Sequence, residues 1–162
     1  MAVSVAIETP LQDDVRKLVA ALNEHLLPLS PLEFQFKMTV EQMAEPHTTV
    51  FVARTENGEA VGCGALKTHG DGLGEVKRMY TMTEVRGQRV GSALLDAVVA
   101  LAREKGLTQL LLETGEGPGF EGAFRLYERS GFTVRGPFLD YPDSEWSRFY
   151  EMALTAPVAA QA

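Results

Sequence analysis

Hydrophobic and polar positions alternate at the start of the chain and then change to a helical spacing. Val3–Glu8 alternates apolar and polar residues, the pattern typical of a half-buried strand. Apolar residues then recur three or four positions apart as far as Leu27, which predicts an amphipathic helix. Thr9 and Gln12 can form a capping box around Pro10, so this helix is expected to begin at Pro10.

The middle of the chain has the pattern of an antiparallel meander. Asn57-Gly58 is a strong hairpin signal between the apolar runs Thr49–Arg54 and Ala60–Lys67. A second glycine-rich turn leads into the expected strand Leu73–Met82. Another capping box, at Thr39–Gln42, predicts a short helix before this meander.

The second half of the chain alternates helices and strands. Helical spacing covers residues 90–105, and the continuous apolar run Leu107–Leu112 is typical of a buried parallel strand. A shorter helix at Glu121–Ser130 and strands at Thr133–Gly136 and Ser147–Leu154 follow. Because a strand–helix–strand crossover is parallel and right-handed, we expect an α/β (α+β) domain. Its mixed, mostly antiparallel sheet has one central parallel crossover and helices on both faces.

Length and composition narrow the class of protein. The 162 residues carry 15 Lys and Arg against 22 Asp and Glu, a net charge of −7, and 45% are hydrophobic. These values favour one globular domain, expected over residues 1–154, with a flexible tail at 155–162. The acidic balance argues against nucleic acid as a partner, and no apolar run is long enough to cross a membrane. The start of the chain lacks the basic region of a signal peptide, so we expect a cytoplasmic location.

Cysteine and histidine positions argue against a disulfide scaffold and against a metal site. The single cysteine cannot form an internal bridge. His25, His47 and His69 lack the spacing of metal ligands. Cys63 stands between two glycines in an expected strand, which favours a buried small hydrophobe over a covalent acyl carrier.

Two glycine-rich loops have the composition of a phosphate site. Arg86–Ala93 joins a strand to a helix N-terminus, whose free amides and dipole attract anions. The alternative for this loop is an ordinary turn with solvated arginines. Gly117–Gly122 matches the dinucleotide fingerprint G-x-G-x-x-G. Pro118 nevertheless removes an amide that a pyrophosphate needs, and antiparallel strands are expected next, which argues against a nicotinamide site.

Four motifs resemble those of the GNAT superfamily of N-acetyltransferases. Gln88–Ala93 (QRVGSA) resembles the family's pyrophosphate signature Q/R-x-x-G-x-G/A, and Glu75–Tyr80 (EVKRMY) resembles its central strand. Leu111–Gly115 (LLETG) and Leu126–Phe132 (LYERSGF) resemble the next strand and a helix end. The resemblance covers residues 3–154, and the segment before the last strand is similar to that of a bacterial subgroup.

The resemblance implies acetyl-CoA as the cofactor and CoA as the product. The pyrophosphate is then expected at the first glycine-rich loop, and the pantetheine arm beside the backbone of the central strand. Arg89 stands where the family more often has glycine, while still offering a cation to phosphate. The implied cofactor-binding residues are Met79, Tyr80, Thr81, Arg86, Gly87, Gln88, Arg89, Val90, Gly91 and Ser92.

The resemblance also implies direct acetyl transfer, in a ternary complex, to a primary amine of a small molecule or protein. Tyr127 occupies the position of the family's general acid, and its alternative is a core tyrosine. Glu75 or Glu113 can take the proton of the amine, although each is alternatively a paired or solvated carboxylate, and a water chain can replace both. The alternative function is a non-catalytic acyl-CoA-binding or regulatory module on the same fold.

The acceptor pocket is expected in the segments that vary most in such a fold, residues 28–38 and 137–146. Their aromatic residues suit an amine with an apolar body, and alternatively form a hydrophobic plug or the contact of a homodimer. Asp140 and Asp143 would place negative charge on this acceptor side, away from the arginines of the cofactor side. The expected pocket residues are Phe34, Phe36, Tyr141 and Trp146.

Overall fold

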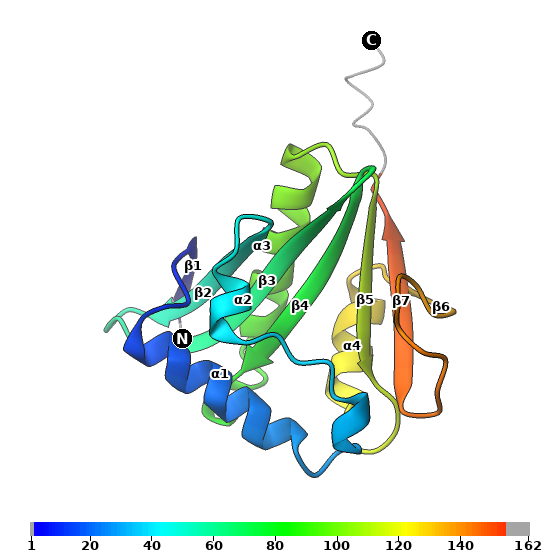
Figure 1. The fold of residues 1–162 in the computed structure, drawn as a ribbon. Coiled ribbons are helices and arrows are strands. Elements are labelled where there is room, and N and C mark those ends of the chain that lie inside the picture. The colour runs from blue at the N-terminus through cyan, green and yellow to red at the C-terminus, as the bar shows by residue number, and fades with distance from the viewer. Residues whose placement is uncertain (1, 155–162) are drawn as a thin grey trace.

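Seven strands form one sheet in the order β1-β2-β3-β4-β5-β7-β6 (Figure 1). The computed structural model describes residues 2–154, so the tail expected at 155–162 lies outside the described residues. All neighbouring pairs are antiparallel except β4 and β5, which are parallel, so the predicted mixed sheet is confirmed. The strands are β1 (Val3–Ile7), β2 (Thr48–Thr55), β3 (Ala60–Gly70), β4 (Leu73–Thr81), β5 (Gln109–Gly115), β6 (Thr133–Arg135) and β7 (Ser147–Ala153).

Helices cover both faces of this sheet, as predicted (Figure 1). One face carries α1 and α2 over a core that includes Val15, Met43 and Val52. The other carries α3 and α4 over a larger core that includes Leu94, Leu112 and Tyr150. No helix within residues 2–154 is long and apolar enough to cross a membrane. The helices are α1 (Asp13–Leu26), α2 (Val40–Met43), α3 (Val90–Glu104) and α4 (Glu121–Arg129), with 3-10 turns η1 (Leu32–Phe34) and η2 (Thr83–Val85).

Local signals set some element boundaries, and contacts distant in sequence shift others. The capping box before α2 forms as predicted, because Thr39 Oγ1 accepts from the Gln42 amide (3.1 Å) and the Gln42 side chain accepts from the Thr39 amide (2.8 Å). The strand expected at Leu107–Leu112 instead occupies Gln109–Gly115. The Thr108 amide donates to a carbonyl of the β3–β4 turn (2.7 Å), which delays the start of the parallel ladder.

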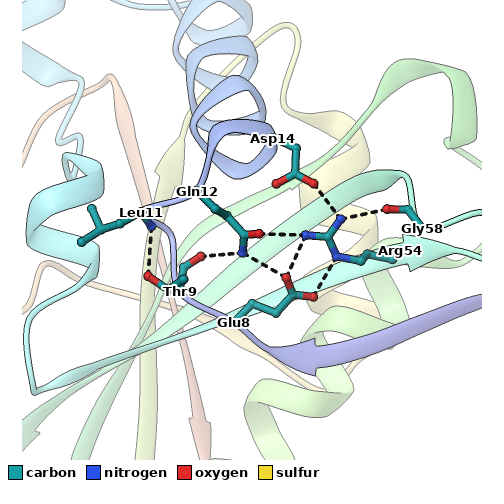
Figure 2. Close-up of polar contacts among 7 residues, drawn as sticks. All are labelled: Glu8, Thr9, Leu11, Gln12, Asp14, Arg54 and Gly58. Carbon is teal, nitrogen blue, oxygen red and sulfur yellow. Dashed lines mark hydrogen bonds and ion pairs between the residues drawn. The ribbon is translucent and has the colours of Figure 1, made fainter.

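Helix α1 begins at Asp13, later than expected, and the capping box predicted at Thr9 is wrong. Figure 2 shows the reason. Arg54 of β2 donates to both oxygens of Glu8 (2.9 and 2.8 Å), and the Gln12 amide group donates to the same carboxylate (3.0 Å) and to the Thr9 carbonyl (2.8 Å). A glutamine engaged in this network does not reach back to the Thr9 amide, which the capping box requires.

Candidate active site

A cleft of about 790 Å³ opens where β4 and β5 separate. The parallel pairing joins only Leu73–Glu75 to Gln109–Leu111, and beyond it the two strands diverge (Figure 1). The cleft is lined by the diverging ends of both strands, the end of α1, residues 34–37, the start of α3 and one side of α4. The divergence leaves β4 backbone groups without a partner on β5, so an extended ligand can pair with them.

Most residues predicted for the site meet in this cleft. From the cofactor set, Gln88 is exposed and outside the lining, and the other nine residues line it. Three other predicted residues, Glu75, Tyr141 and Trp146, also lie outside the lining. The predicted residues that line the cleft are Phe34, Phe36, Met79, Tyr80, Thr81, Arg86, Gly87, Arg89, Val90, Gly91, Ser92, Glu113 and Tyr127.

The loop before α3 has the geometry of an anion site. Gly87 has a φ of +86°, and no atom lies within 4 Å of the position that a Cβ would take. Arg89 precedes the helix with a φ of 63°, a left-handed conformation that suits the glycine common in GNAT loops. The first amides of this 15-residue helix have no partner within it, so they face the cleft with a partial positive charge. Arg129 reaches the same place from α4 and donates to Ser92 Oγ (3.1 Å).

Glu113 and Tyr127 line the cleft opposite β4, and burial raises the pKa of both. The pKa of Glu113 rises to about 7, mainly because the carboxylate is shielded from water. Ser147 Oγ donates to its Oε2 (2.8 Å), whereas its Oε1 accepts no hydrogen bond from residues 2–154. Burial and the nearby Glu113 charge keep the Tyr127 hydroxyl protonated, and this hydroxyl has no partner within residues 2–154.

Glu75 lies behind the cleft wall and is fully engaged in hydrogen bonds. Only 2% of the residue is exposed. His69 Nε2 lies 2.9 Å from its Oε1, while Tyr141 Oη (2.5 Å) and Lys77 Nζ (3.2 Å) donate to its Oε2. Lys77 also donates to the Tyr141 hydroxyl (2.7 Å), so Glu75, Lys77 and Tyr141 are each hydrogen-bonded to the other two. The structure therefore places Glu75 beside the cleft, connected to it through Lys77.

The aromatic residues expected around the acceptor divide into two groups. Phe34 and Phe36 line the cleft, and Phe36 packs edge-on against Tyr141 with ring centroids 5.1 Å apart. Trp146 stands before β7, outside the cleft. The loop carboxylates expected on the acceptor side, Asp140 and Asp143, are exposed and do not line it either.

The sequence interpretation missed the cations of β4 and Ser147. Lys77 and Arg78 lie inside the EVKRMY motif, where two adjacent cations in a buried strand were the available signal. Seven of the chain's 15 Lys and Arg residues line the cleft, against two carboxylates, Glu113 and Glu121. These seven are Lys37, Lys77, Arg78, Arg86, Arg89, Arg125 and Arg129.

Cys63 is fully buried in β3, as expected for a small hydrophobe. Its thiol donates to the Arg78 carbonyl (3.4 Å), and burial raises the pKa of the thiol to about 12. A thiol with this pKa stays protonated near neutral pH and is a poor nucleophile.

Comparison with known proteins identifies the family. The family model for acetyltransferases of the GNAT family matches residues 17–132. The chain belongs to the GNAT family. It is an acyltransferase, because the family model and the similar proteins are all named acetyltransferases. It is 40% identical over 153 residues to an IAA acetyltransferase of Azospirillum brasilense, covering 94% of this chain and 98% of that protein. It is also 36% identical over 137 residues to the N-acetyltransferase YsnE of Bacillus subtilis, covering 83% and 90%.

Solved structures of GNAT proteins show the same fold. A Klebsiella pneumoniae protein assigned to the acyl-CoA N-acyltransferases is 32% identical, with a TM-score of 0.79 over 94% of this chain and 98% of that one. PaiA N-acetyltransferase of Thermoplasma acidophilum, solved with coenzyme A, is 15% identical with a TM-score of 0.74 over 95% and 100%. A GNAT acetyltransferase of Elizabethkingia anophelis, solved with acetyl-CoA, is 18% identical with a TM-score of 0.68 over 94% and 98%.

Proposed function

We propose that this GNAT protein transfers the acetyl group of acetyl-CoA directly to a primary amine of a small molecule or protein, in a ternary complex. One observation carries the proposal: a single cleft joins an anion-binding helix start, an unpaired strand backbone and two titratable side chains, Glu113 and Tyr127. The acetyl-CoA and CoA complexes of similar folds support the same cofactor here. When bound, acetyl-CoA supplies an acyl group activated as a thioester.

The lining residues fit this cofactor. The open space at Gly87 lets phosphate oxygens approach the α3 amides, and Arg86 and Arg89 add positive charge there. Those amide and carbonyl groups of Met79–Thr81 that do not pair with β3 suit an extended arm that itself carries amides. One of them, the Thr81 carbonyl, accepts from Arg86 Nε (3.2 Å). Because Gln88 lies outside the lining, we assign it no contact with the cofactor.

Glu113 is our candidate for the group that accepts the proton of the amine. An amine attacks only when neutral, and the cations that line the cleft lower the pKa of an amine bound among them. A pKa near 7 leaves Glu113 ionised in mildly alkaline solution, and its Oε1 has no competing partner within residues 2–154. These properties are those of a general base.

Tyr127 is our candidate for the general acid. Its hydroxyl keeps its proton at neutral pH, lines the cleft, and is available to protonate a leaving sulfur. Glu75 we assign to positioning, because both of its oxygens already accept from His69, Lys77 and Tyr141. Its carboxylate holds Lys77 at the cleft wall and ties the loop after β6 to β4.

Acetyl-CoA turnover with an amine panel tests the proposal, with thiol release as the readout corrected for hydrolysis. We expect CoA, but not NAD(H), to raise the melting temperature, and at least one amine to accelerate thiol release. Stabilisation by CoA without amine-dependent release would instead favour a non-catalytic acyl-CoA-binding module. Stabilisation by NAD(H) alone would contradict the proposed cofactor.

The variant Tyr127→Phe tests the acid, and Tyr150→Phe is its matched control. The two rings pack together with centroids 5.9 Å apart, but the Tyr150 hydroxyl donates to Glu128 (2.7 Å), outside the cleft. Loss of a general acid lowers kcat by about 100-fold or more. We expect this loss in Tyr127→Phe with an almost unchanged CoA affinity, and wild-type turnover in Tyr150→Phe. Equal turnover of both variants would remove Tyr127 from its role.

A further inference from the structure

Arg78 is a buried cation at the end of the cleft nearest α1. It is only 9% exposed and lines the cleft. Its φ is 53°, which is uncommon for a residue with a side chain, and the β3–β4 register shifts at this point. Val76 packs with the core under α3, whereas Tyr80 packs with the core under α1. A bulge at Arg78 therefore changes which face of the sheet the following side chains of β4 point to. Strained residues of this kind cluster at ligand sites.

The Arg78 guanidinium lacks a counter-ion within residues 2–154. Its Nη2 donates to the Asn23 side chain of α1, a neutral partner. Its buried Nε has no partner, and no carboxylate within the described part of the chain forms an ion pair with it. The remaining nitrogen, Nη1, makes no hydrogen bond to these residues and is not buried from solvent. Nη1 is therefore the atom of the guanidinium that a ligand in the cleft can reach. A buried guanidinium without a carboxylate is costly unless a ligand supplies one.

The surroundings of Arg78 are aromatic, aliphatic and positively charged. Phe34, Phe36 and Tyr80 line the same cleft together with Leu22 and Leu26 of α1, the helix whose Asn23 contacts Arg78. The further charged or titratable side chains near these residues are His25, Lys37, Lys77 and Arg86, whose guanidinium lies over the Tyr80 ring, 6.0 Å from its centroid. The wall is held in place by Gln35, whose side-chain nitrogen lies within hydrogen-bond distance of the carbonyl oxygens of Leu26 (3.1 Å), Leu27 (3.2 Å) and Ser30 (2.6 Å).

We infer that the acceptor of this acetyltransferase is an amino carboxylate, whose carboxylate binds Arg78 and whose apolar body packs against Phe34, Phe36 and Tyr80. The inference rests on the proposed function, and names its substrate class. Arginine binds carboxylates with charge-assisted hydrogen bonds, which are stronger and more directional than neutral ones. Arg89 stands at the N-terminus of α3, where we place the cofactor phosphates, which leaves Arg78 for a second anion.

A binding experiment tests Arg78 without requiring turnover. The CoA complex of the full chain is titrated calorimetrically with phenylacetate and with phenylacetamide, which differ only in the charged group. We expect phenylacetate to bind about tenfold or more tightly than phenylacetamide, and Arg78→Met to abolish this preference. Arg103→Met, an exposed arginine outside the cleft, is the matched control and should keep it. Equal binding of the two probes by the wild-type protein would overturn the inference, whether or not the variant folds.

A kinetic comparison separates this inference from the proposed function. Amines with a free carboxylate and their carboxamides are compared as acceptors by kcat/KM, at a pH where the amines are largely neutral. A wild-type preference for the carboxylates, lost in Arg78→Met and partly kept in Arg78→Lys, is the expected result. Acetylation without that preference overturns the inference and leaves the proposed function standing. Preferential use of succinyl-CoA over acetyl-CoA with a neutral amine, dependent on Arg78, would assign the carboxylate to the acyl donor and overturn the inference as well.

Discussion

Replacing Glu113 by Gln should stabilise the protein while inactivating it. The pKa of Glu113 is raised from about 4.5 to about 7, so the fold disfavours the ionised carboxylate. Above pH 7 the side chain is ionised in both the folded and the unfolded protein, and only the folded form bears the cost of burying the charge. A difference of about 2.5 in pKa corresponds to about 3 kcal/mol of unfolding free energy. Below pH 4.5 both forms are protonated, and this cost vanishes.

Melting temperatures measured across pH check this value. For a chain of this size, about 3 kcal/mol corresponds to a rise of roughly 5–10 °C. Glu113→Gln should therefore melt higher than wild type at pH 8.5 and at nearly the same temperature at pH 4.5. Glu56→Gln makes the same chemical change at an exposed site in the β2–β3 turn, and should melt like wild type at both pH values.

The activity of the same variant checks the role of the group as a base. The wild-type kcat/KM should rise through about pH 7 as Glu113 loses its proton. In Glu113→Gln we expect kcat to be about 100-fold lower. The pH dependence of its kcat/KM should then show only the titration of the acceptor amine. An inflection near pH 7 that survives the substitution would assign it to another group. Equal melting temperatures at pH 8.5 would show that the carboxylate is solvated, and would refute the electrostatic reasoning.

Three further substitutions test other parts of the structure. Arg89→Glu should weaken CoA binding, measured by titration, with a loss that shrinks as salt is added; equal affinity at low salt would exclude a phosphate contact. Gly115→Ala would place a Cβ 2.1 Å from the Phe120 ring, and should lower the unfolding free energy by about 1–3 kcal/mol in urea. Arg54→Met leaves Glu8 and Asp14 without the cation that lowers the pKa of each. Its cost should be about 1 kcal/mol near pH 7 and should arise mostly at Glu8, because the Asp14 side chain is 47% exposed. The cost should begin to fall below about pH 4.5 and vanish only below the lowered native pKa values of both carboxylates; a cost that persists in stronger acid would mean lost packing instead.

Much of the fold was predictable because its signals are local. The Asn57-Gly58 hairpin and the capping box at Thr39 each depend on neighbouring residues, and both form as expected. The start of α1 was not predictable from the same kind of signal, because Arg54 of β2 competes for Gln12 and Glu8 from more than 40 residues away. A capping box read from sequence alone cannot include such a distant competitor.

The site was less predictable than the fold, because strand alternation fails at Arg78. A strict period of two places Val76, Arg78 and Tyr80 on one face of β4. In the structure Val76 and Tyr80 contact opposite cores, since the bulge inserts an extra residue between them. The motif therefore located the strand, while the direction of its central arginine depended on a backbone conformation that the residue pattern does not encode.

The net charge of −7 conceals how this molecule uses its cations. Seven of the 15 Lys and Arg residues line one cleft that holds only two carboxylates, while the loop carboxylates Asp140 and Asp143 lie outside it. A positive cleft attracts an anionic cofactor and also favours the neutral form of a bound amine, which is the form that attacks. It would repel an acceptor whose only charge is an ammonium group. An acceptor that also carries a carboxylate avoids this repulsion. The electrostatics of the cleft therefore favour the same class of substrate as Arg78, which has no carboxylate partner within residues 2–154.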